Sequence, residues 1–309
     1  MINFKNNIIV SILMVVVLLS LNGCTNNRKS QEPPKQTMEN TISNDTAIMD
    51  KLNIIMQKAD VTTESIIKFM DENIASLSKQ NASTLIMTLE KSQKLLLAKM
   101  QDAFAENENI QKMLAKDYQG SLTESYINGI QEKVSRDLLL VVKNSGLKIE
   151  TAEGVYYPVI DYGFFKKYRG NVSPDIAAYI DVMAIESDKT PDKDAALRIG
   201  WDEILIRASN QEDFLKNYGN STKAEDVRTL LKKYLVFALY GANNTPLFSY
   251  DNKEMVPAAK QAYLQAIIDS NHGSFSKIMT EYINLLKKND YKLTKEVDDY
   301  RKQAVENFR

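Results

Sequence analysis

The sequence predicts an all-α fold, predominantly helical and bundle-like, with one short β-hairpin near residues 147–161. Apolar residues recur at spacings of three and four through most of the 309 residues, which is the period of helices that bury one face. Only residues 147–150 and 155–159 alternate with the period of two that is typical of strands. Hydrophobic residues make up 44% of the chain, as expected for a protein with a core.

Four helical segments are predicted before the hairpin. Thr62 is suited to cap the first helix, and a second helix is expected to follow Ser83. A short helix is expected over residues 109–117. Residues 121–124 form a capping box, and the apolar pattern after them continues to Gly146, a residue type that commonly ends helices. Short connections between these segments favour an antiparallel bundle.

Helices return after the hairpin. Ser-Pro at 173–174 and Thr-Pro at 190–191 each pair an N-cap with proline at the first helical position. A further capping box at 222–225 opens a helix that Gly241 closes. The expected helices span residues 174–186, 192–209, 210–219, 223–241, 257–269, 274–288 and 294–308.

Composition along the chain predicts four sections. Residues 1–23 have the pattern of a signal peptide. The polar stretch 24–45, which contains Pro33-Pro34, is predicted to be a flexible stalk. An N-terminal helical bundle is expected over residues 46–146, and the hairpin with a C-terminal helical region over 147–309. One continuous domain over 46–309 is equally compatible with the pattern.

The first 24 residues carry the clearest functional signal. An apolar run from Ile8 to Leu21 follows Lys5, and it is too short for a comfortable membrane span of about 20 residues. Leu21, Gly23 and Cys24 then resemble the lipobox of bacterial lipoproteins. The resemblance implies diacylglycerol attached to Cys24, removal of residues 1–23, and an extracytoplasmic protein anchored to the bacterial cell membrane. It covers residues 1–24 alone and implies no activity.

Composition excludes several classes of protein. Lys and Arg total 39 against 40 for Asp and Glu, so no basic excess points to nucleic acid. Cys24 is the single cysteine, which leaves no disulfide and no cysteine metal ligands. Phosphate-binding glycine loops are absent, and no cofactor is expected.

The densest unusual feature is an aromatic cluster after Gly154. Tyrosine combines apolar area with a polar tip, so Tyr156, Tyr162 and Tyr168 are candidate ligand-binding residues. Packing of the hairpin against helices is the alternative explanation. Tyr156 and Pro158 lie on the strand face opposite Tyr157 and are expected to be its exposed side.

Three further groups are candidate sites. Asp188, Asp192 and Asp194 are weak calcium candidates, and the stabilisation of a helix N-terminus by acids is the plainer explanation for the last two. The single histidine, His272, could be a catalytic base, but its setting is more typical of a helix end. Adjacent Asp202 and Glu203 do not converge on one helix face, while Trp201 fits a core position.

These observations favour a lipid-anchored surface protein whose helical domain binds a small ligand or another envelope protein. An envelope-polymer hydrolase with Asp/Glu chemistry is one alternative, which requires a cleft where two carboxylates converge and one has a raised pKa. An atypical solute-binding lipoprotein of an import system is the other, although the scarcity of strands counts against it.

Overall fold

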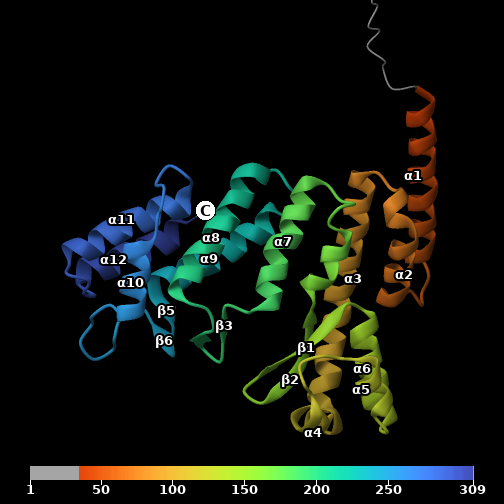
Figure 1. Ribbon diagram of the computed structural model, residues 1–309, viewed down its shortest axis with the longest axis horizontal. Helices are drawn as coiled ribbons and strands as arrows, with labels where there is room; N and C mark the ends of the chain where they lie inside the picture. Colours follow the sequence, from red (N-terminus) through yellow and green to blue (C-terminus); the bar gives the residue numbers. More distant parts are fainter. Residues whose placement is uncertain (1–34, 309) are drawn as a thin grey trace, which may run out of the picture.

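The computed structural model describes residues 35–308, with side chains from Asn44 onward. It is 67% helical, with short antiparallel strand pairs, so the predicted helical fold with a small hairpin is confirmed. Cys24, the predicted signal peptide and residues 24–34 of the predicted stalk lie outside the described residues. Figure 1 shows the helices side by side along the longest axis, with α1 at one end and α11 and α12 at the other.

The part before the hairpin is helical throughout. Its elements are α1 (Lys35–Met56), α2 (Thr63–Asn73), the short 3₁₀ helix η1 (Ile74–Ser76), α3 (Lys79–Glu106), α4 (Glu108–Asp117), α5 (Glu124–Gly129) and α6 (Lys133–Asn144). The expected cap of α2 is confirmed, because the Thr62 hydroxyl accepts a hydrogen bond from the Ser65 amide. The 28-residue helix α3 runs beside the hairpin and carries Glu90 and Leu97.

Three boundaries in this part differ from the expected ones. Helix α1 begins at Lys35, within the stretch expected to be a stalk, and its Asp45 carboxylate accepts the Ser78 amide at 2.9 Å. Helix α3 begins four residues before Ser83, because Ser78 is its cap. The single helix expected from residue 124 to Gly146 is two helices, since the Glu132 carboxylate caps α6 separately.

The hairpin is confirmed, and its pairing sorts the side chains. Strand β1 (Leu147–Ala152) pairs antiparallel with β2 (Val155–Ile160), which sets Ile149 opposite Pro158. This face is buried against the helices. Gly146, at φ +65°, makes the turn from α6 into β1 and lies so close to the Gln93 amide that a side chain there would clash.

The rest of the chain adds helices and two very short hairpins. Its elements are the 3₁₀ helix η2 (Tyr162–Tyr168), α7 (Pro174–Asp188), β3 (Asp192–Lys193), β4 (Ala196–Leu197), α8 (Trp201–Tyr218), α9 (Ala224–Tyr240), β5 (Gly241–Ala242), β6 (Thr245–Pro246), α10 (Pro257–Gln265), α11 (Ser274–Lys288) and α12 (Lys295–Asn307). Helices α7, α9, α11 and α12 lie close to their expected ranges.

The helix expected over residues 192–209 is wrong at its start. Asp194 and Ala195 have positive φ angles of 52° and 57°, so the chain turns there and forms the β3–β4 hairpin instead of a first helical turn. Helix α8 begins only at Trp201 and then runs without a break to Tyr218, through the expected boundary at residue 210.

Buried apolar residues form two main clusters. One extends from Ile48 to Ile180 and includes the inner face of the hairpin, and the other extends from Ile199 to Phe308. A small group made of Tyr179, Phe214 and Val227 lies between helices α7, α8 and α9. In Figure 1, α7 lies between α3 and the pair formed by α8 and α9. Helix α7 therefore joins the two main clusters.

No helix among residues 35–308 is both long enough and apolar enough to cross a bilayer.

Candidate functional site

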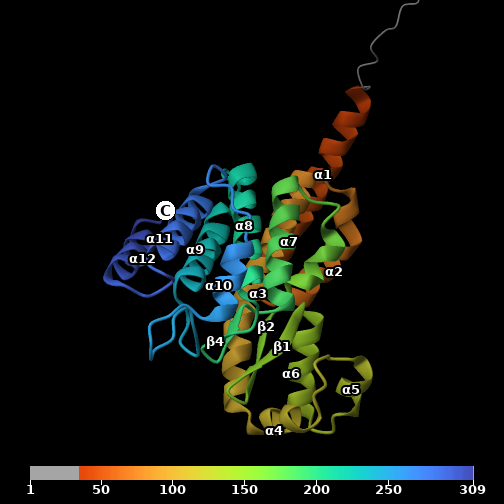
Figure 2. The same cartoon turned by 60° about the vertical axis from the view of Figure 1, so that its left-hand side comes forward.

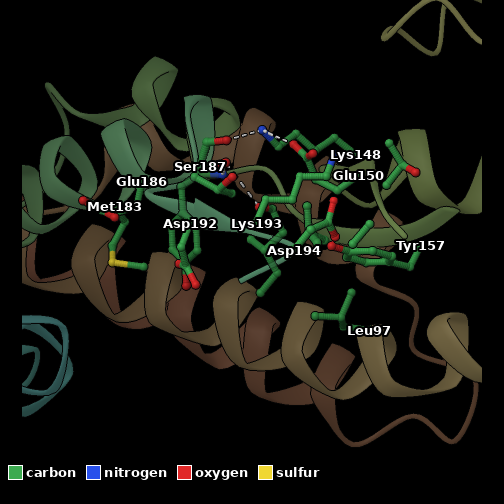
Figure 3. Close-up of a pocket in the computed structure, with 16 residues that line it drawn as sticks. Leu97, Lys148, Glu150, Tyr157, Met183, Glu186, Ser187, Asp192, Lys193 and Asp194 are labelled. Carbon is green, nitrogen blue, oxygen red and sulfur yellow. Dashed lines mark hydrogen bonds and ion pairs between the residues drawn. The ribbon is translucent and has the colours of Figure 1, made fainter. Parts of the chain in front are cut away.

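One cavity, which we call the hairpin pocket, lies beside the β1–β2 hairpin and has a volume of about 460 Å³. Segments far apart in the sequence form its wall. Figure 3 shows Leu97 on α3, Met183 and Glu186 on α7, and Asp192 to Asp194 on the β3 strand and turn gathered around it. Most of its exposed lining is apolar, so the pocket suits a ligand with an apolar body.

The outer face of the hairpin supplies one wall. Because side chains alternate along a strand, the face opposite the buried Ile149 and Pro158 carries Lys148, Glu150 and Tyr157. Tyr157 stands directly across from Glu150 in the register. Burial, followed by the charges of Glu150 and Asp194, raises the pKa of the Tyr157 hydroxyl, which therefore remains a hydrogen-bond donor at neutral pH.

The end of α7 supplies the opposite wall. The Lys148 ammonium reaches across from β1 and donates to the Ser187 carbonyl, while its distance to the Glu150 carboxylate is 3.4 Å. The Ser187 hydroxyl accepts the amide of Tyr162 at 3.1 Å. The hairpin and α7 are thus joined by polar contacts along the pocket.

Three hairpin turns meet at one end of the pocket. The Glu153 amide, in the turn of the β1–β2 hairpin, donates to the Asp194 carboxylate at 3.1 Å. In the turn of the β5–β6 hairpin, the Asn244 side chain donates to the Asp194 carbonyl at 2.9 Å, and its amide donates to Ala195 at 2.8 Å. Three short hairpins from distant parts of the sequence are therefore linked in series.

The charges in the pocket are mostly paired. Asp192 lies 2.7 Å from Lys233, and Lys148 is engaged as described above. Lys193 differs: within the described part of the chain, no hydrogen bond or ion pair holds its ammonium group. It is the lysine in the pocket that remains free to bind an anionic group of a ligand.

Glu186 is a largely buried carboxylate of the site, with 11% of its side chain exposed. Tyr234 donates to both of its oxygens at 2.8 and 2.7 Å, and the Arg207 guanidinium lies 3.6 Å away. Burial raises the pKa of Glu186, and the bonds from Tyr234 and the charge of Arg207 offset the rise only in part. Its oxygens are directed to α8 and α9, so Glu186 connects the pocket to the second apolar cluster.

A second polar group, the Glu90 cluster, lies where α3, η2, α7 and α9 meet. One Glu90 oxygen accepts the hydroxyls of Tyr162 and Tyr179, each at 2.8 Å, and the other lies 2.5 Å from the Lys223 ammonium. Lys94 completes the cluster at 2.9 Å. Burial alone would raise the pKa of Glu90, but Lys223, Lys94 and Tyr162 lower it to about 2.

The three candidate tyrosines do not converge. Tyr156 packs edge-on against Tyr118, and its amide donates to Gln111 at 2.8 Å. Tyr162 lines the hairpin pocket while its hydroxyl binds Glu90, and the Tyr168 hydroxyl donates to Asp71 at 2.6 Å. Of the three, Tyr162 is the residue that reaches the pocket.

The prediction that Tyr156 and Pro158 form the exposed face of β2 is wrong. Pro158 is buried and Tyr156 is partly covered, whereas Tyr157 lines the pocket. The apolar residues Leu147 and Ile149 on β1 fix the inner face, and the register then places Pro158 on that same side. The apolar residues Leu147 and Ile149, combined with the register of a short hairpin, were the signal in the sequence that could have identified Tyr157.

The calcium candidates have separate partners. Asp188 pairs with Lys166 at 2.9 Å, Asp192 with Lys233, and Asp194 with the Glu153 amide. In residues 35–308 no three histidine, cysteine or acidic side chains gather as metal ligands. The explanation by a helix N-terminus is also wrong for Asp192 and Asp194, because both lie in the β3–β4 hairpin.

A second cavity of about 510 Å³, which we call the α8–α10 groove, contains His272. The His272 Nε2 atom lies 2.8 Å from the Asp213 carboxylate, and the residue belongs to the connection between α10 and α11 rather than to a helix end. Asp202 lines this groove, whereas Glu203 pairs with Arg207. Trp201 is buried in the second apolar cluster, as expected.

No protein-family model matches this chain, and comparisons with curated proteins and with solved structures give no match.

Proposed function

We propose that this chain is a lipid-anchored, extracytoplasmic binding protein whose small ligand occupies the hairpin pocket. The observation that carries the proposal is the construction of that pocket. Most of the exposed area of its wall is apolar, its acidic groups are held by partners, and Lys193 remains free to bind an anionic group. The proposed ligand accordingly has an apolar body and one anionic group.

Native mass spectrometry of the purified full chain tests this. We expect an additional small mass that is lost on denaturation. Met183→Trp should abolish the additional mass because the larger side chain fills the pocket, and Lys193→Met should weaken binding. Leu95→Trp is the matched control, since Leu95 is 67% exposed on α3 and does not line the pocket. A bare protein, or a mass that persists in Met183→Trp, would contradict the proposal.

The anchor is tested separately. Proteolysis and mass spectrometry of protein extracted from bacterial membranes should yield an N-terminal peptide that begins at Cys24 and carries diacylglycerol. A peptide that extends before Cys24, or an unmodified thiol, would remove the anchor and leave the pocket proposal standing.

A hydrolase with Asp/Glu chemistry is the second candidate. The observation in its favour is that Glu186, whose pKa is raised, lies in the same pocket as Glu150 and Asp192. The hydrolase hypothesis predicts that the protein cleaves purified wall polymers and that Glu186→Gln abolishes the cleavage. Undiminished cleavage in that variant would exclude Glu186 as the acid.

A further inference from the structure

The α10–α11 connection presents an unusually exposed apolar surface. Ile267 is 101% exposed, Leu264 at the end of α10 is 52% exposed, and Ile206 on α8 is 58% exposed. Ile206, Ile267 and Ile268 line the α8–α10 groove together. We call the three isoleucines Ile206, Ile267 and Ile268 the apolar rim. Single exposed apolar residues are ordinary, whereas a group of them at one groove marks an interaction surface.

The position of the rim relative to the chain start indicates what covers it. In Figures 1 and 2 the α10–α11 connection lies at the upper edge of the molecule, and α1 projects from that same edge. Cys24 precedes Lys35 by eleven positions, so it lies within roughly 40 Å of Lys35 even at full extension of the chain. An anchor on Cys24 would therefore keep this edge within reach of the bilayer.

The charges around the groove argue against attraction to anionic headgroups. Asp202 and Asp269 line it, and within residues 44–308 no lysine or arginine does. A contact at this surface must depend on burial of apolar side chains, with Ile267 as the most exposed of them.

We propose that the apolar rim inserts into the boundary of the lipid bilayer and forms a second membrane contact beside Cys24. The proposal rests on the proposed lipid anchor, which sets the edge that faces the membrane. Insertion would fix the orientation of the body, whereas a lipid on Cys24 alone would only tether it.

A thiol placed in the rim makes this measurable. Cys24 is the single cysteine of the chain, and acylation removes its free thiol, so Ile267→Cys in the lipidated full chain accepts one environment-sensitive fluorophore. The labelled protein is reconstituted into phosphatidylcholine nanodiscs with and without nitroxide-bearing lipid. Ile185→Cys is the matched control, because Ile185 is 41% exposed in the last turn of α7, just before β3 and outside the rim.

We expect blue-shifted emission at position 267 and at least threefold stronger nitroxide quenching there than at position 185. Equal quenching at the two positions, or quenching that requires phosphatidylglycerol in the disc, would overturn insertion. Formation of a dimer that buries position 267 without nitroxide quenching would overturn insertion as well.

The number of fluorophores bound per chain distinguishes failure of the anchor from failure of the rim contact. Two labels per chain would show that Cys24 is free, and the anchor would then fail. The Cys24→Ser variant, with its single thiol at position 267, would in that case report on the rim alone in the same nanodiscs. Loss of its quenching would overturn the proposal, and retained quenching would support it without the anchor.

Discussion

Two carboxylates in neighbouring regions, those of Glu90 and Glu186, have pKa values that are shifted in opposite directions. In the Glu90 cluster an ammonium group lies 2.5 Å from the carboxylate, and the pKa of Glu90 falls to about 2. Glu186, beside the hairpin pocket, is held mainly by the Tyr234 hydroxyl, and burial raises its pKa. Tyr162 belongs to both regions, since it lines the pocket and donates to Glu90.

The difference separates a structural role from a functional one. A buried charge with a complete set of partners holds elements together and leaves no capacity for a ligand. Polar groups that are incompletely compensated mark sites where chemistry or binding can occur. By that criterion the Glu90 cluster joins the two apolar clusters, and the hairpin pocket, with its free Lys193, is the proposed binding site.

The largest expected effect comes from removing the cation of the Glu90 cluster. Lys223→Met leaves the carboxylate buried without its closest partner, and we expect the free energy of unfolding to fall by about 3 kcal/mol or more. Urea denaturation at neutral pH measures this. Lys232→Met on the same helix is the control, because Lys232 is exposed, and it should change stability by less than about 0.5 kcal/mol. Equal effects in the two variants would remove the structural role assigned to the cluster.

The sequence predicted the features that depend on neighbouring residues, and it missed those that depend on contacts between distant parts of the chain. The Thr62 cap, the β1–β2 hairpin and Gly146 depend on neighbouring residues, and all three are confirmed. The start of α8 was wrong because the β3–β4 turn is held by Asn244, about 50 residues away. Lys193 and Glu186 were not identified, since their significance depends on partners that only the folded chain brings near.

The second effect is on pH dependence. The pKa of Glu90 is lowered from 4.5 to about 2 on folding, so its contribution is fully present above pH 4.5 and is lost as pH falls toward 2. The loss should amount to about 3 kcal/mol, because each pKa unit corresponds to about 1.4 kcal/mol. Unfolding measured from pH 7 to pH 2 should show this slope in the natural chain. A Glu90→Gln variant that retains the whole slope would assign it to other carboxylates.

Glu186→Gln should show the opposite sign and a smaller effect. Because the folded-state pKa of Glu186 is raised, its favourable contribution is present below pH 4.5 and is lost as pH rises through the folded-state value. Glutamine does not ionise, so the variant should gain stability relative to the natural chain as pH rises. Thermal unfolding between pH 4 and pH 8 measures the difference, with the exposed Glu106→Gln as control. A difference that does not change with pH would place Glu186 among the fully compensated charges.

The smallest effect concerns the strained turn at the pocket. Ala195 has φ +57°, a conformation that costs an alanine roughly 1 kcal/mol, and its carbonyl accepts the Asn244 amide at 2.8 Å. Ala195→Gly relieves that strain but adds freedom to the unfolded chain, so we expect a net stabilisation of about 0.5 kcal/mol. Ala196→Gly, one residue later on β4, has no such strain to relieve and should destabilise by a similar amount. Opposite signs in urea denaturation would show that the linked hairpin turns hold Ala195 in place against its own preference, whereas matching losses would show that the turn relaxes. Strain that persists beside a pocket and is absent from the Glu90 cluster fits a division in which ion pairing stabilises the junction and the turns shape the site.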